Sequence, residues 1–149
     1  MTLDWNAFRA LRQARFTMLT CAFVAPALYG GAITMQTLGG RWQRGFQNLA
    51  RVPWREPRLE ITALLALVAL AGALALPPRL TSGSSPLAVL RTRTLLAALL
   101  LLASSICALY LGVTVGYTAA PLAFGLLIAV PVAGCGLFPS EARWNRALG

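Results

Sequence analysis

Hydrophobic residues gather in four long runs along the chain, and polar, arginine-rich segments separate these runs. The runs lie near residues 16–38, 61–76, 94–115 and 121–138. A helix rises about 1.5 Å per residue and the hydrocarbon core of a bilayer is about 30 Å thick, so about 20 apolar residues cross it. The pattern predicts an all-α polytopic membrane protein with four transmembrane helices, in which residues 1–149 form a single membrane domain.

Prolines divide these runs. Pro26 lies inside the first run and Pro131 inside the fourth, so we expect a kink or an interruption at each. Pro77 and Pro78 end the second run, because adjacent prolines remove backbone donors and disfavour further helix. We expect residues 79–94 to form a loop.

The polar segments carry arginine beside aromatic residues. In the N-terminal segment, arginines recur every three residues from Arg9 to Arg15, which predicts a helix lying at the membrane interface. A basic, aromatic loop at residues 39–58 follows the first run, and we expect a short interfacial helix in it up to Pro53. The candidate lipid-headgroup residues in the two segments are Arg9, Arg12, Arg41, Trp42, Arg44, Arg51, Trp54 and Arg55.

Composition supports a membrane setting. Of the 149 residues, 58% are hydrophobic and 11% are charged, against roughly 25% charged in an ordinary soluble domain. These values argue against a soluble globular enzyme, a disordered tail and a disulfide-rich secreted module. All 13 basic residues are arginine and only 4 residues are acidic, which gives a net charge of +9.

This positive charge favours membrane lipids over nucleic acid as partners, because the arginines flank apolar runs and do not form one patch. We expect no cofactor, and the alternative is a structural anionic phospholipid such as cardiolipin. Four crossings place both termini on the same side of the membrane. That side carries eight of the thirteen arginines, which favours the cytosol or the matrix.

No catalytic or metal-ligating pattern is visible. The chain has no histidine, and its cysteines all lie in apolar runs without a C-x-x-C spacing: Cys21, Cys107 and Cys135. Glu60 falls at a membrane edge near Arg58, which favours an interfacial residue over a proton path. For Gln36, Ser104 and Ser105, hydrogen bonds between helices are favoured over a substrate path. We therefore expect a protein without enzymatic activity.

Small residues spaced four apart occur in three of the runs. Such spacing lets helix backbones approach closely within a membrane. The pairs that we expect at helix contacts are Ala69 and Ala73, Gly112 and Gly116, and Ala129 and Ala133.

Residues 120–141, APLAFGLLIAVPVAGCGLFPSE, resemble the C-terminal signature of the sideroflexin family. In that family an A-P-Ω-Q opening, with Ω hydrophobic, leads through an apolar helix to V-P-x-A-C-x-L-F-P-Q. Gly134 is an additional residue relative to this pattern, and Ser140 stands in place of the glutamine. The matching positions are Ala120, Pro121, Leu122, Val130, Pro131, Ala133, Cys135, Gly136, Leu137, Phe138 and Pro139.

The segment after the first run also resembles this family, at Trp42, Phe46, Asn48 and Arg51. The resemblance implies a multi-pass protein of the mitochondrial inner membrane, and the family is associated with transport of serine and other small molecules. A bacterial inner membrane is the alternative location.

Three functional hypotheses follow. The first is a non-enzymatic accessory subunit of a larger inner-membrane complex, such as a respiratory complex or an ATP synthase, which holds lipid and neighbouring helices. The second is a small sideroflexin-like transporter of serine or another amino acid, with Pro26 and Pro131 near its path. The third is the small membrane subunit of a bacterial carboxylate transporter.

Overall fold

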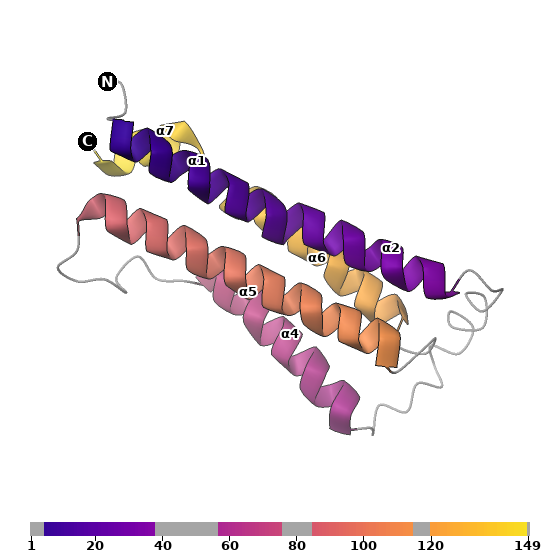
Figure 1. Cartoon of the computed structure of the whole chain (residues 1–149). Helices are drawn as coiled ribbons and strands as arrows, with labels where there is room; N and C mark the ends of the chain where they lie inside the picture. Colours follow the sequence, from indigo (N-terminus) through magenta and orange to yellow (C-terminus); the bar gives the residue numbers. More distant parts are fainter. Residues whose placement is uncertain (1–4, 38–56, 76–84, 115–119, 149) are drawn as a thin grey trace.

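The structure, a computed structural model, describes residues 5–37, 57–75, 85–114 and 120–148. Each of these ranges is helical over nearly all its length, and none contains a strand. The long helices lie side by side as an elongated bundle, with both chain ends at the same end of it (Figure 1). The helical class that the hydrophobic pattern predicts is therefore confirmed for the described residues.

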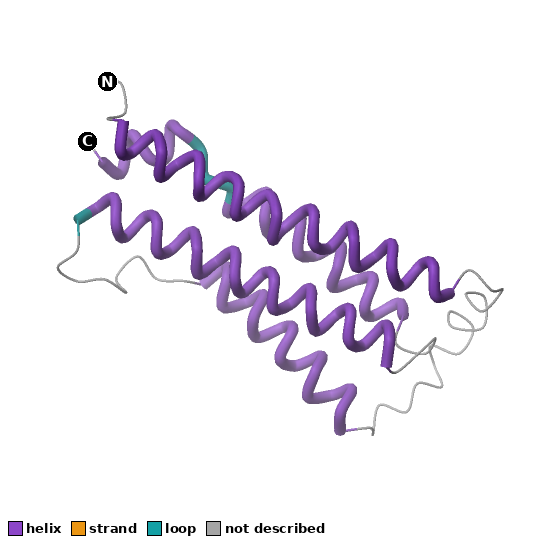
Figure 2. Tube along the Cα trace, in the orientation of Figure 1, coloured by secondary structure: helices purple, strands orange, loops and turns teal. Residues whose placement is uncertain are grey.

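The first range forms one continuous helical rod (Figure 2). It consists of α1 (Trp5–Leu19), the π-helical segment η1 (Thr20–Val24) and α2 (Ala25–Thr37). The prediction of a separate interfacial helix ahead of a span at residues 16–38 is therefore wrong. Residues 5–16 contain no proline or glycine that would end a helix before the apolar run. Helix α1 also buries an apolar stripe in the bundle. We refer to residues 5–37 as the N-terminal rod.

Pro26 explains the π-helical turn. A proline has no N–H to donate, and its ring crowds the carbonyl group four residues earlier. Directly ahead of it the chain widens by one residue, so that the Ala25 N–H bonds to the Thr20 carbonyl. The disturbance expected at Pro26 is thus taken up as a wide turn inside a continuous rod.

Helix α4 spans Pro57–Ala75 and helix α5 spans Pro86–Thr114. The predicted loop at residues 79–94 is wrong from Pro86 onward, because α5 begins eight residues before the apolar run. Pro86 suits the first turn of a helix, where no N–H is needed. Ser85 caps this turn, since its side-chain oxygen accepts from the Ala88 N–H at 3.4 Å. Arg91 and Arg93 consequently lie on a helix.

Helix α6 spans Ala120–Leu137, and the short helix α7 spans Glu141–Leu148. The interruption expected at Pro131 does not occur, because α6 continues through this residue. Val130 and Ala133, on either side of Pro131, are both buried in the bundle core. Packing on both sides of the proline offsets the lost backbone hydrogen bond.

Helix α5 is the centre of the bundle. It contacts every other described element, whereas α4 contacts α5 and, to a smaller extent, α6. Three helices are long and apolar enough to cross a membrane, namely Trp5–Met35, Pro57–Ala75 and Pro86–Val113. The segment Pro121–Leu137 is apolar but shorter. Of the four predicted spans, three therefore meet this criterion within the described residues.

Candidate functional site

Gly112 of α5 lies against the N-terminal rod. It is buried, and a Cβ atom at this position would lie 2.5 Å from Cδ1 and 2.9 Å from Cγ1 of Ile33. Ile33 itself is fully buried. Glycine thus allows α5 and α2 to approach as closely as they do. Gly116, its predicted companion, lies outside the described residues.

A second close approach joins α6 to the rod at Gly134. A Cβ atom there would lie 2.6 Å from the Cβ atom of Ala22, which belongs to η1. Sequence reasoning treated Gly134 only as an additional residue in the family pattern. Gly134 directly follows Ala133, which was predicted at a helix contact, and this pair of small residues is a signal that could have indicated the close approach.

In each of the two predicted alanine pairs, only one alanine is buried in the bundle. Ala73 and Ala133 are buried, whereas Ala69 and Ala129 are only half-buried. Helix α4 instead buries residues seven apart, namely Leu59, Ala66 and Ala73. A spacing of seven is typical of helices that cross at a small angle.

Two serine hydroxyls lie in the middle of α5. Ser105 donates to the Leu101 carbonyl of the same helix at 3.0 Å, so this hydroxyl bonds within α5 and not between helices. Ser104 is fully buried, and its Oγ has no hydrogen-bond partner within the described parts of the chain. The side chain of Gln36 lies outside the described residues.

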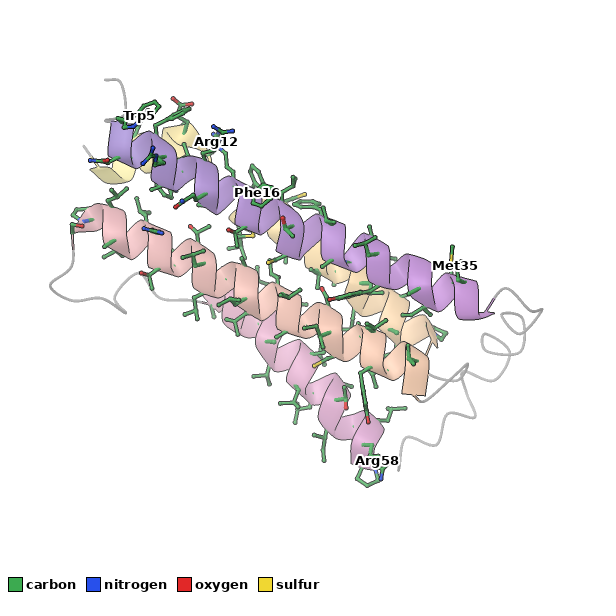
Figure 3. All side chains as sticks on the ribbon, viewed as in Figure 1. Trp5, Arg12, Phe16, Met35 and Arg58 are labelled. Carbon is green, nitrogen blue, oxygen red and sulfur yellow. The ribbon has the colours of Figure 1, made fainter. Side chains whose placement is uncertain are left out.

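Arginines gather at the end of the bundle where the rod and α5 begin. Arg15 is half-buried, and its Nε donates to the Pro139 carbonyl at 3.1 Å, which ties the rod to the junction between α6 and α7. Arg9 and Arg12 are exposed. The Arg9 guanidinium lies 5.9 Å from the centre of the Trp5 ring. Figure 3 shows Trp5 and Arg12 at this end and Arg58 at the opposite end of the bundle.

A groove runs between α1 and the first turns of α5. Its inner lobe has a volume of about 540 Å³ and is lined by residues that include Arg12, Phe16 and Thr17. Its outer lobe, of about 610 Å³, is lined by residues that include Asn6, Ser85 and Thr92. Four residues line both lobes, and these are Arg9, Gln13, Arg91 and Leu95. We call these two lobes together the basic groove.

Trp144 closes the same end of the bundle. It lies on α7 and is 2% exposed, in a cluster with Ala10, Leu11 and Ala14 of α1. The sequence analysis did not identify Trp144 as a buried residue. The pattern that indicates its burial is the amphipathic sequence of Glu141–Leu148, in which one large apolar side chain stands among charged and polar residues.

The other candidate residues do not add to these contacts. The predicted headgroup residues of the basic, aromatic loop all lie outside the described residues, namely Arg41, Trp42, Arg44, Arg51, Trp54 and Arg55. Glu60 is exposed in the first turn of α4. The three cysteines are free, and the described residues contain no group of three or more side chains placed to hold a metal ion.

Comparisons of the chain with protein-family models, with curated proteins and with solved structures give no match. The resemblance of residues 120–141 to the sideroflexin signature therefore stays a hypothesis.

Proposed function

We propose that the chain is a non-enzymatic accessory subunit that packs against other subunits of a larger inner-membrane complex, of the respiratory-complex or ATP-synthase kind. The exposure of α4 carries this proposal. Helix α4 buries Leu59, Ala66 and Ala73 along a single stripe. Leu70 is half-buried against the bundle core. The other large apolar side chains of α4 are exposed, and they are Ile61, Leu64, Leu65, Leu67, Val68 and Leu74.

Membrane helices associate mainly through close packing and hydrogen bonds, because lipid tails are as apolar as leucine and provide no hydrophobic drive. Within the described residues, α4 packs along one side against α5 and α6, and its opposite side is left uncovered. A helix from another subunit, seated on the exposed leucines, would supply a second stripe. The exposed face and the small inner stripe together fit a helix that lies between this chain and a neighbour.

Gentle solubilisation of the native membrane tests the proposal. We expect the full chain to migrate in a large assembly with fixed stoichiometry. A photoreactive residue in place of Leu64 should link the chain to a protein of defined mass. The matched substitution at Met35, which is 79% exposed on the N-terminal rod, should give lipid adducts instead. Migration of the chain alone, with lipid adducts from both positions, would contradict a subunit role.

The proposed location is the mitochondrial inner membrane, as the resemblance implies, or the inner membrane of a bacterium. Fractionation of the source cells, with markers for each membrane, tests this proposal. Recovery of the chain with another membrane would count against it.

The second candidate function is transport of a small polar molecule such as serine. The fully buried Ser104 hydroxyl favours it, because a buried polar group without a partner is costly and offers a contact to a substrate hydroxyl or amine. In this case purified protein in liposomes should take up labelled serine, and Ser104→Ala should reduce the uptake. Ser105→Ala is the control, since its hydroxyl is already bonded within α5.

A further inference from the structure

We infer that the basic groove between α1 and α5 binds the phosphate headgroup of an anionic lipid, and that its two lobes suit a lipid with two phosphate groups. This inference rests on the membrane setting of the proposed function but not on any partner subunit. The lobes follow each other along the groove, and Arg9 and Arg91 line both of them.

The charge of the groove is unbalanced within the described residues. Three guanidinium groups line it, those of Arg9, Arg12 and Arg91, and no acidic residue is part of either lining. The described acidic residues are Glu60, in the first turn of α4, and Glu141, in the first turn of α7. Guanidinium groups bind phosphate oxygens with two parallel hydrogen bonds, so an anion here would offset their mutual repulsion.

Both sides of the basic groove, formed by α1 and α5, change from basic to apolar toward the middle of the bundle. On α1, Phe16 follows Arg12 by four residues, and on α5, Leu95 follows Arg91 by four residues. Residues four apart lie on the same helix face, one turn from each other. Both helices begin at the same end of the bundle, so both walls become apolar toward its middle (Figure 1). A lipid has the same order, with its phosphate outside and its acyl chains inside.

The lobes also differ in their other polar groups, which supports two separate phosphates. Thr17 lines the inner lobe, and its hydroxyl is already bonded to the Gln13 carbonyl at 3.0 Å. The outer lobe adds Asn6, Ser85 and Thr92, which can donate to phosphate or glycerol oxygens. A lipid with two phosphodiester groups joined by glycerol carries two negative charges, one for each lobe.

Lipid binding to the purified full chain tests the inference. We would add phosphatidylcholine, phosphatidylglycerol or cardiolipin to the protein in a neutral detergent and measure bound lipid by native mass spectrometry. Cardiolipin should bind at least about tenfold more tightly than phosphatidylcholine, and more tightly than phosphatidylglycerol at equal total charge. Equal binding of all three lipids would overturn the inference. Equal binding of cardiolipin and phosphatidylglycerol per charge would overturn its two-phosphate part.

Single arginine substitutions locate the site. Arg9→Gln and Arg91→Gln should each weaken cardiolipin binding about tenfold, because each removes a wall of both lobes. Arg93→Gln makes the same change of charge two residues away, on a side chain that lines a different cavity with Trp144. It should leave binding unchanged. An equal loss in Arg93→Gln would show general attraction to this end of the bundle and would contradict a specific groove.

Two further measurements distinguish lipid binding from a loss of folding and from binding of a free phosphate compound. The thermal midpoints of the three variants should equal that of the unmodified protein, since all three arginines are exposed. Inorganic phosphate and glycerol 3-phosphate at millimolar concentration should not displace cardiolipin. If they displace it, the groove serves a free phosphate compound and the lipid assignment is wrong. Because lipid binding is measured on the isolated chain, its failure leaves the proposed subunit role untouched, and the reverse also holds.

Discussion

The N-terminal rod and α4 both pack on α5, but the two contacts are built differently. At Gly112, the rod comes so close that an added Cβ atom would lie 2.5 Å from Ile33. At Gly72 of α4, the nearest atom to an added Cβ atom is Cδ1 of Leu100, at 3.5 Å, which is an ordinary contact. Of the most apolar stretch of each helix, 28% is buried in the rod and 17% in α4.

This difference teaches which part of the bundle has a fixed shape. The rod meets α5 at Gly112 and α6 at Gly134, and at both positions a Cβ atom fits only if a neighbour shifts. Elsewhere, at Gly30, the rod makes only ordinary contacts with α6. Helix α4 contacts α5 at an ordinary van der Waals distance at Gly72, where a Cβ atom fits. We therefore expect substitutions at the rod contacts to be severe and those on α4 to be mild.

The largest effect should come from Trp144→Ala on the rod side. This change removes a buried ring from the cluster of Ala10, Leu11 and Ala14, and large-to-small core changes of this kind cost about 3–5 kcal/mol. Denaturant titration in detergent would measure the free energy of unfolding. Trp5→Ala is the matched control, since Trp5 is 67% exposed. Similar losses in both variants would contradict the burial of α7 against α1.

The next effect should come from Gly134→Val, because the new side chain would collide with Ala22. Overpacking of this kind costs about 1–3 kcal/mol, and a neighbour held so close to the backbone leaves little room to relax. Gly125→Val on the same helix is the control, because the Gly125 position has open space around it. If both variants unfold at the same denaturant concentration, α6 does not approach the rod at Gly134 as closely as these distances indicate.

Replacing one glycine on each side by alanine compares the two contacts with α5 directly, and we expect smaller effects here. Gly112→Ala should destabilise the protein by about 1 kcal/mol, because the gain in helix propensity only partly offsets the collision with Ile33. Gly72→Ala should be neutral or slightly stabilising, since its Cβ atom fits. Ile33→Ala should itself destabilise the protein, because Ile33 is fully buried. In the Ile33→Ala background, Gly112→Ala should cost less than in the unmodified protein, because the colliding side chain is absent. Thermal unfolding of the four variants measures these differences. Equal shifts of the thermal midpoint in Gly112→Ala and Gly72→Ala would contradict a closer contact of α5 with the rod than with α4.

The smallest effect on stability should come from the outer face of α4. Leu64→Ala should change the free energy of unfolding of the isolated chain by less than about 0.5 kcal/mol, because Leu64 is 62% exposed. The same variant should reduce recovery of the chain in a large assembly after gentle solubilisation. Unchanged recovery, together with a clear loss of stability, would show that α4 packs within this chain more extensively.

The long helices were predictable because the hydrophobic effect marks them residue by residue along the chain. The start of α5 was not recognised because the serine, glycine and proline residues of 81–86 indicated a turn in a loop, although Ser85 and Pro86 are also a typical helix beginning. Arginine roles were also beyond sequence reasoning. Arg9, Arg12 and Arg15 have identical spacing, yet only Arg15 bonds to the Pro139 carbonyl.

The tight contacts were only half predictable for a related reason. Spacing within one helix shows that small residues share a face, but it does not identify the residue opposite. Gly134 meets Ala22, and Gly112 meets Ile33, across large distances in sequence. The tertiary arrangement of the rod, with its inserted turn, determines both pairings.

The wide turn before Pro26 has a mechanical consequence. A turn with an extra residue is ordinarily the place where a long helix bends, because its hydrogen bonds are the least regular. Here that turn contains Ala22, the residue against which Gly134 lies most closely. The rod cannot swing about this hinge without first separating from α6, so its two halves are expected to move as one lever.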